Sequence, residues 1–172
     1  MNLSEYQIAA ERTMVPTQPR HEAMLNAALG LCGEAAEAAK AYEYDTAHLP
    51  EECGDLLWYV AQMCWAHGES IANIPPNDQG WNEERALEML WHHSGFVADQ
   101  VKKYVFHQRP ISVVVFFDSL AQVITAVETL LGFHGVRLET VCAANNQKLL
   151  KRFPAGYTHA DANARKDEAD HV

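Results

Sequence analysis

Four acidic residues stand in two pairs of equal spacing. Glu34 and Glu37 are three residues apart, and Glu52 and Asp55 repeat that spacing further along the chain. Residues at i and i+3 of an α-helix project from one face. If two such helices pack antiparallel, the four carboxylates converge and repel one another unless a cation lies among them. All-oxygen ligands suit the hard cations Mg²⁺ and Mn²⁺, which also take phosphate oxygens.

The same acids have interpretations that need no metal. Glu51 and Glu52 follow Pro50 in the predicted first turn of a helix, where acidic side chains favour the helix dipole. Glu34 and Glu37 can form a solvated helix face. Spacing alone leaves both interpretations open.

Three residues near the C-terminal end suggest a phosphate-binding stripe. Asn145, Lys148 and Arg152 fall at i, i+3 and i+7, on one face of a predicted helix that ends before Phe153-Pro154. One amide and two cations suit a polyphosphate. The alternative is that these basic residues only favour the dipole at a helix C-terminus.

Other catalytic patterns are not found. The predicted helices lack the two Glu-x-x-His spacings of a di-iron bundle, so di-iron chemistry is disfavoured. P-loop, dinucleotide-binding and nucleophile-elbow motifs are absent as well.

Composition predicts a folded protein without a nucleic-acid surface. Of 172 residues, 48% are apolar and 21% charged, and the net charge of −10 opposes broad contact with a phosphate backbone. The cysteines form no Cys-x-x-Cys pair, and the N-terminus carries no secretory signal. We therefore expect free thiols and a cytoplasmic protein.

The pattern of apolar residues predicts an all-α fold. We expect helices from about Ser4, as N-cap, to Thr13, from His21 to about Tyr44, and from Pro50 onward. The helix from Pro50 has two predicted faces: a buried one of Cys53, Leu56, Leu57, Val60 and Cys64, and an opposite one of Glu52, Asp55, Tyr59 and Gln62. The aromatic residues Trp58, Tyr59 and Trp65 are available for base stacking, although such residues on a helix usually belong to the core.

The second half of the chain resembles a degenerate copy of the first. Residues 33–37 match 95–99, and matching continues at the same offset to Lys40 and Lys102. Such a repeat predicts two helical hairpins about a pseudo-twofold axis, and chance similarity of two amphipathic pairs is the alternative. The copy lacks two acids, since Phe96 and Val115 stand where the first half has Glu34 and Glu52.

Two segments need separate interpretation. Residues 111–117 have strand propensity, yet we assign helix through Phe133, because a polar stripe follows and packing overrides propensity. This stripe makes residues 111–133 an amphipathic core helix in preference to a membrane span; it consists of Asp118, Gln122, Thr125 and Thr129. We predict one domain over 1–157, with halves at about 1–76 and 81–157, and a disordered tail over 158–172.

Several segments together resemble the MazG-like, all-α nucleoside triphosphate pyrophosphohydrolase superfamily, which includes the dimeric dUTPases. The resemblance is carried by Glu5-Tyr6-Gln7 with Thr13, by residues 26–37 and 51–59, and by residues 145–149 and 152–157. The order of the Glu-x-x-Glu and Glu-x-x-Asp motifs is specific to this context. The matching segments cover about half of the chain.

The resemblance implies Mg²⁺-dependent cleavage of a nucleoside triphosphate, ribo- or deoxyribo-, between the α- and β-phosphates. It implies metal binding by Glu34, Glu37, Glu52 and Asp55, substrate binding by Asn145, Lys148 and Arg152, and a homo-oligomer, typically a dimer. We assign catalysis to Glu37, which would orient or deprotonate the attacking water, and to Glu34.

The sequence departs from the family pattern at two places. Ala36 replaces a usual glycine, and a degenerate repeat is inserted from about Trp81 to Gly135. The repeat suggests an internal stand-in for a second subunit, whose Lys102, Lys103 and Arg109 either face the polyphosphate or form a solvated basic end. The rival functions are a non-catalytic nucleotide-binding or assembly protein that kept the fold, and a purely structural helical bundle.

Overall fold

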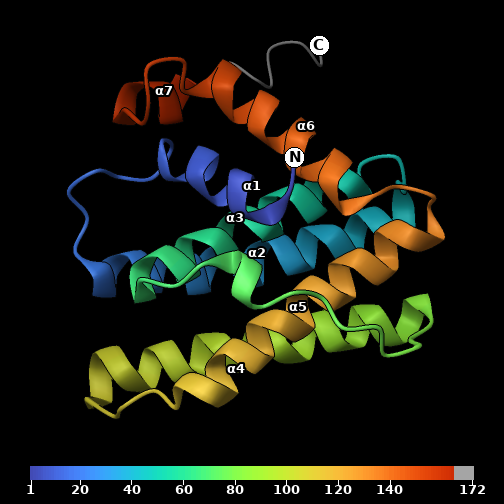
Figure 1. Cartoon of the computed structure of the whole chain (residues 1–172), viewed down its shortest axis with the longest axis horizontal. Coiled ribbons are helices and arrows are strands. Elements are labelled where there is room, and N and C mark those ends of the chain that lie inside the picture. The colour runs from blue at the N-terminus through green and yellow to red at the C-terminus, as the bar shows by residue number, and fades with distance from the viewer. Residues whose placement is uncertain (165–172) are drawn as a thin grey trace.

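The computed structural model describes residues 1–164, and this part of the chain is all-helical, which confirms the predicted fold class. These residues form seven α-helices and one short 3₁₀-helix, and Figure 1 shows their arrangement. Their bounds are α1 Leu3–Glu11, α2 Arg20–Tyr44, α3 Leu49–His67, η1 Ile71–Asn73, α4 Glu83–His107, α5 Val113–Phe133, α6 Leu138–Arg152 and α7 His159–Ala164.

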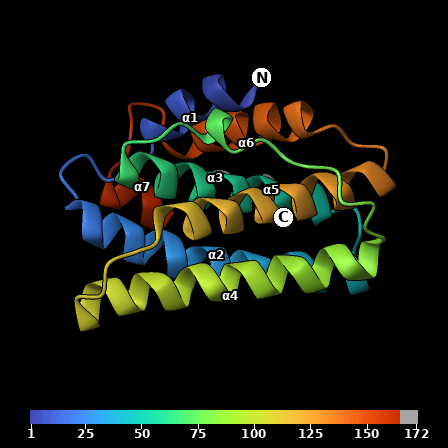
Figure 2. The ribbon, with the colours of Figure 1, turned by 60° about the horizontal axis from the view of Figure 1, so that its bottom comes forward.

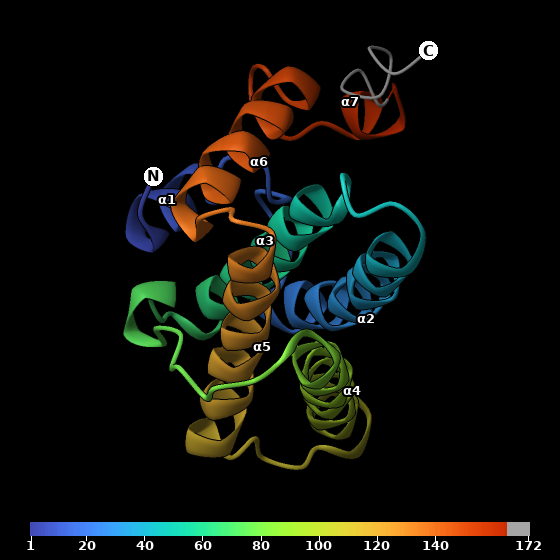
Figure 3. The ribbon, with the colours of Figure 1, turned by 90° about the vertical axis from the view of Figure 1, so that its right-hand side faces the viewer.

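Two antiparallel hairpins form the centre of the molecule. Helices α2 and α3 pack along each other, as do α4 and α5, and the hairpins meet through α2 against α4 and α3 against α5. Figure 3 shows this four-helix arrangement, with α1 and α6 lying beside α3 on the side away from α4. Figure 2 shows the same layers, with α4 at one edge and α1 and α6 at the other. Two hairpins are thus present, whereas the pseudo-twofold axis and the duplication inferred from the sequence repeat stay predictions.

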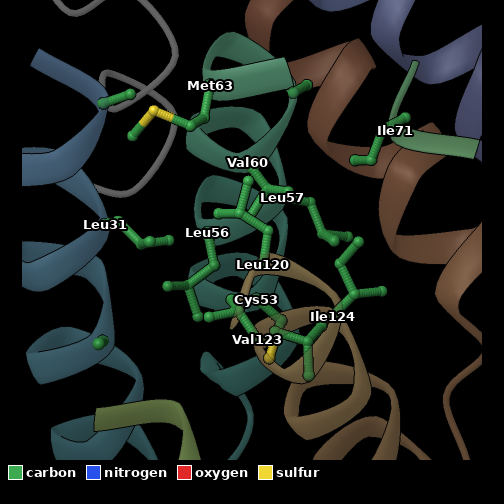
Figure 4. Packing of buried hydrophobic residues seen from close by; sticks show 14 of the residues in the cluster. Leu31, Cys53, Leu56, Leu57, Val60, Met63, Ile71, Leu120, Val123 and Ile124 are labelled. Atoms are coloured by element: carbon green, nitrogen blue, oxygen red, sulfur yellow. The ribbon is translucent and has the colours of Figure 1, made fainter. Parts of the chain in front are cut away.

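Helix α3 is the centre of the core because neighbours cover it on several sides. The predicted buried face, from Cys53 through Leu56 to Cys64, is fully buried, which confirms the 3.6-residue pattern. Figure 4 shows this face packed against Leu31 of α2 and against Leu120 of α5. Gln62 was assigned to the opposite face, but it is also buried, because α2 covers it.

The first helix begins earlier than the sequence predicts. Asn2, and not Ser4, is the N-cap, since its side chain accepts a hydrogen bond from the Glu5 backbone and the Glu5 carboxylate accepts one from the Asn2 backbone. This reciprocal pair satisfies two otherwise free N–H groups. Helix α1 then ends at Glu11, two residues before the predicted end at Thr13.

Helix α5 forms in spite of the strand propensity of its first residues. It has the length and apolar character of a membrane span, with a mean hydropathy of 1.6, and half of its most apolar window is buried inside the protein. Leu120, Ile124, Val127 and Leu131 are fully buried against the rest of the bundle. The helix therefore packs as a core element, as predicted, but Thr125 of the predicted polar stripe is buried as well and donates to the Ala121 carbonyl.

The region beyond α6 differs from the predicted disordered tail. Residues His159–Ala164 form the short helix α7, which Asp161 helps to start by accepting a hydrogen bond from the Thr158 hydroxyl at 2.7 Å. The rest of the predicted tail, 165–172, lies outside the described residues.

Candidate metal and nucleotide site

A cleft of about 430 Å³ lies where α2, α3 and α6 meet the loop between α1 and α2. Of the seven residues predicted to bind metal or substrate or to take part in catalysis, six line this cleft, and the seventh, Asn145, is bonded to Asp55 of the lining. The lining residues are Thr13, Val15, Gln18, Asn26, Glu34, Glu37, Glu51, Glu52, Asp55, Trp58, Tyr59, Gln62, Lys148, Leu149, Arg152, Phe153 and Tyr157.

Three of the four predicted metal ligands come together in the cleft. Glu34 and Glu37 on α2 and Glu52 on α3 each offer a carboxylate oxygen, and these oxygens lie within 4.8 Å of one another. The i, i+3 spacing on α2 and the antiparallel packing of α3 produce this meeting, as the sequence analysis expected. An oxygen cluster of this size has the dimensions and the donor type of a site for a hard cation.

The pKa values of two of these acids are raised by their surroundings. Burial and the nearby charges of Asp55, Glu37 and Glu52 raise the pKa of Glu34 to about 8. Burial, followed by the charges of Glu37 and Asp55, also raises the pKa of Glu52. Burial and the mutual repulsion of the carboxylates thus oppose full ionisation of the cluster.

Asp55, the fourth predicted ligand, is held by the protein's own groups. Its Oδ1 accepts a hydrogen bond from Asn145 Nδ2 at 2.7 Å, and its Oδ2 accepts one from Lys148 Nζ at 2.5 Å. Lys148 also reaches Glu51 Oε1 at 3.2 Å. Two residues predicted to bind substrate are therefore paired with a predicted metal ligand, an arrangement the sequence analysis did not anticipate.

The charge of Lys148 is preserved in spite of its partial burial. Burial is the largest single influence and lowers the pKa of this ammonium group, but Asp55 and Glu51 together raise it above its ordinary value. Lys148 thus remains a cation within an acidic cleft. Arg152 lines the same cleft one turn further along α6, so the predicted basic stripe does face the acids.

A buried tyrosine fixes the position of Asn145. The Tyr6 hydroxyl lies 2.7 Å from Asn145 Oδ1 and 3.1 Å from the Gly54 carbonyl oxygen, and the Tyr6 side chain is fully buried. Gly54 permits the close approach, because a Cβ there would lie 2.9 Å from Asn145 Cβ. Helices α1, α3 and α6 meet at this point, and Asp55 is oriented through Asn145. Tyr6 is one of the residues that carry the family resemblance, but no sequence pattern predicts its contact with Asn145.

Aromatic and amide side chains line the cleft further from the acids. Trp58 Nε1 donates to Thr13 Oγ1 at 2.8 Å, and the Trp58 and Tyr59 rings are nearly perpendicular, with centroids 4.9 Å apart. The Tyr59 ring covers Gly30 of α2, where a Cβ would approach within 2.1 Å of the ring. Trp65, the third aromatic residue considered for base stacking, is not among the residues that line the cleft.

The basic residues of the second hairpin lie elsewhere. Lys102 donates to Asp99 at 2.7 Å, and Lys103 pairs with the same carboxylate. Neither lysine lines the cleft, and neither does Arg109, which follows the end of α4. Within one chain, these cations therefore do not face the acid cluster.

No protein-family model, curated protein or solved structure matches the chain. What characterises the protein is its own structure: a helical bundle with a cleft that combines clustered carboxylates with the cations Lys148 and Arg152.

Proposed function

We propose that the protein is a Mg²⁺-dependent nucleoside triphosphate pyrophosphohydrolase of the MazG-like type, which releases a nucleoside monophosphate and pyrophosphate. One observation carries the proposal: three carboxylates within 4.8 Å of one another share a cleft with Lys148 and Arg152. Clustered acids suit a hard cation, and nearby cations suit a phosphate chain. The resemblance of the Glu-x-x-Glu and Glu-x-x-Asp motifs supports the same activity.

The donor set fits magnesium or manganese. Glu34, Glu37 and Glu52 supply oxygen ligands, and the raised pKa of Glu34 reflects a site that a divalent cation would stabilise in its ionised form. Asp55 would join this set once Lys148 releases it. When bound, Mg²⁺ neutralises charge on phosphate oxygens and lowers the pKa of a water molecule.

The chain's own residues would divide the remaining work. Glu37 is exposed at the cleft, so it can accept the proton of an attacking water, while the more buried Glu34 supports it within the same cluster. Lys148 and Arg152 would stabilise the negative charge that develops on the departing pyrophosphate. Asn145 would contribute to substrate binding only through Asp55, which it holds in place.

The proposal also includes an origin for the second hairpin, α4 and α5. Helices α4 and α5 pack on α2 and α3 as a second subunit would, and we propose that they derive from an internal duplication whose copy lost its acids. Association of whole chains into a homodimer and a cytoplasmic location belong to the same proposal, as the family resemblance and the free thiols suggest.

A second candidate is a nucleotide-binding protein without efficient chemistry. The pairing of Asp55 with Lys148 favours it, because an acid so held is withdrawn from a metal site. The two candidates differ in turnover and not in binding, so hydrolysis separates them.

The test is a panel of ribo- and deoxyribonucleoside triphosphates with Mg²⁺, in which pyrophosphate and phosphate are measured separately. We expect pyrophosphate and monophosphate, and we expect Glu37→Gln to abolish their formation. Asp99→Asn is the matched control, since Asp99 holds the aligned position in the second hairpin and pairs with lysines outside the cleft. Release of phosphate alone, or full activity of the Glu37 variant, would refute the proposal, and nucleotide binding without product would favour the second candidate.

A further inference from the structure

Two amide side chains meet in the cleft at a defined distance from the acids. Asn26 Nδ2 donates to Gln62 Oε1 at 2.9 Å. Asn26 precedes Glu34 by eight residues on α2, and Gln62 follows Asp55 by seven on the antiparallel α3, so the pair lies about 12 Å from the acid cluster along the helices. The Tyr59 ring, packed on Gly30, lies between the two ends.

The amide pair has hydrogen-bonding capacity that the protein does not use. Each amide offers two donor hydrogens and an acceptor oxygen, and the described residues provide one bond between the two groups. Gln62 is only 1% exposed as a residue and lines the cleft, and Asn26 is exposed there, so the unused donors and acceptor of the pair open onto the cleft. In the same cleft, Gln18 Oε1 is buried without a hydrogen-bond partner among the described residues. A buried oxygen such as that of Gln18 normally has a partner, which a polar ligand in the cleft would supply.

The surroundings of the pair suit a flat and largely apolar group. Trp58 donates its single polar hydrogen to Thr13, so the rest of its indole presents an apolar surface. Val15 lines the cleft as well. A flat ligand with donors and acceptors on its edge and apolar faces matches this composition.

We infer that this end of the cleft is a nucleobase subsite in which Asn26 and Gln62 hydrogen-bond to the edge of the base and Trp58 packs against it. The inference rests on the proposed function for the position of the phosphates. A base bound here would lie at the far end of a nucleotide whose phosphates reach the acids two helical turns away.

The subsite accepts amino bases and keto bases alike. With Asn26 Nδ2 bonded to Gln62 Oε1, the groups left to face a base are the Gln62 Nε2 donor and the Asn26 Oδ1 acceptor, and a joint rotation of both bonded amides reverses their order. Adenine and cytosine then meet one arrangement, and guanine, uracil and thymine meet the other. We expect affinities for the different bases to agree within about tenfold.

The test is binding and not turnover, so that it remains readable whatever the catalytic result. Calorimetry with Mg²⁺ would compare non-hydrolysable α,β-methylene nucleoside triphosphates with tripolyphosphate, which carries no base. We expect Asn26→Ala and Gln62→Met to weaken nucleotide binding about tenfold, the effect of one or two lost hydrogen bonds, with tripolyphosphate binding unchanged within about twofold. Asn146→Ala, on α6 and outside the cleft lining, should change neither.

Three results would overturn the inference. The first is wild-type protein that binds nucleotides no better than tripolyphosphate, and the second is a loss that is equal for both probes. The third is nucleotide affinity that neither variant changes. Asn26 is exposed, so its variant should fold even if the Gln62 variant does not. Failure of the proposed function gives a different pattern, in which no pyrophosphate forms and Glu37→Gln leaves tripolyphosphate binding as it was.

Discussion

Lys148 Nζ lies 2.5 Å from Asp55 Oδ2, so the protein's own cation is bound to one of the four acids that the sequence assigns to a metal. A phosphate chain would attract Lys148 away from Asp55 and leave this carboxylate available to a divalent cation. Metal and phosphate would then strengthen each other's binding, because each removes an obstacle to the other. In the proposed enzyme, the pairing of Lys148 with Asp55 is thus a source of cooperativity between metal and phosphate.

Removal of this lysine should separate the two binding events. In Lys148→Met, Asp55 no longer has a competing cation, so we expect the free protein to bind Mn²⁺ about three- to tenfold more tightly. Pyrophosphate binding should weaken by a similar factor, because a charge-assisted hydrogen bond is lost. Titration of Mn²⁺ by electron paramagnetic resonance, with and without pyrophosphate, measures both effects.

Lys151→Met provides the control for this change. Lys151 is exposed on α6, three residues from Lys148, and does not line the cleft, so its removal changes the net charge equally. Its Mn²⁺ affinity should remain close to that of the wild type. Weaker Mn²⁺ binding by Lys148→Met would show that Lys148 supports the metal site and does not compete with it.

The raised pKa of Glu34 predicts that the free energy of unfolding decreases as pH rises. The folded protein keeps the Glu34 proton up to about pH 8, whereas the unfolded chain loses it near the ordinary value of 4.5. Between these values the folded state binds more protons, so the free energy of unfolding decreases as pH rises. The contribution is complete below about pH 4.5 and is lost as pH rises through about 8. Each 1 kcal/mol lost lowers the Tm by roughly 2–4 °C in a domain of this size.

Thermal unfolding between pH 5 and 8 measures this slope. In Glu34→Gln the titrating group is gone, so the decline in Tm should be shallower than in the wild type. Saturating Mg²⁺ should also flatten it, because a bound cation favours the ionised carboxylates. A Tm that rises across this range in the metal-free wild-type protein would contradict the assigned direction of the pKa shift.

The sequence predicts helix faces better than helix ends. Burial of Cys53, Leu56 and Val60 follows from the 3.6-residue period, which is a local property and survives in the fold. The N-cap is a choice between neighbours of similar propensity. Ser4 has a capping side chain with Gln7 three residues on, but Asn2 has Glu5 in that position and closes a reciprocal pair.

The same distinction applies to the site, where contacts between neighbouring helices follow from local spacing and contacts between distant segments do not. The meeting of Glu34 and Glu37 with Glu52 follows from spacing within helices and a short connection between them. The pairing of Lys148 with Asp55 depends on how α6 lies across α3, a relation between segments more than 90 residues apart. No local pattern specifies that register, so the competition at Asp55 emerges only in the folded structure.

The Tyr6 hydroxyl should stabilise both the fold and the site. In Tyr6→Phe, the buried Asn145 Oδ1 loses the single O–H donor that it shares with the Gly54 carbonyl, which should cost about 1–3 kcal/mol in the free energy of unfolding. Asn145 would also hold Asp55 less firmly, so turnover should fall. Urea unfolding measures the first effect, and Tyr104→Phe, at an exposed tyrosine, should leave stability unchanged. Equal stability of the two variants would show that the buried hydroxyl contributes nothing.

Two glycines of α2, Gly30 and Gly33, should differ in how substitution by alanine changes the stability of the protein. At Gly30 a Cβ would lie 2.1 Å from the Tyr59 ring, whereas at Gly33 nothing lies within 4 Å. Gly33→Ala should therefore stabilise α2 by up to about 1 kcal/mol, the ordinary difference in helix propensity. Gly30→Ala gains the same propensity but must displace the Tyr59 ring, and overpacking typically costs about 1–3 kcal/mol. Its stability should fall below that of Gly33→Ala by at least about 1 kcal/mol in urea unfolding.

The displaced ring should also weaken nucleotide binding in Gly30→Ala and not in Gly33→Ala, since Tyr59 forms the wall between the acids and the amide pair. Equal stability and equal affinity in the two variants would mean that Tyr59 does not pack on α2 in solution.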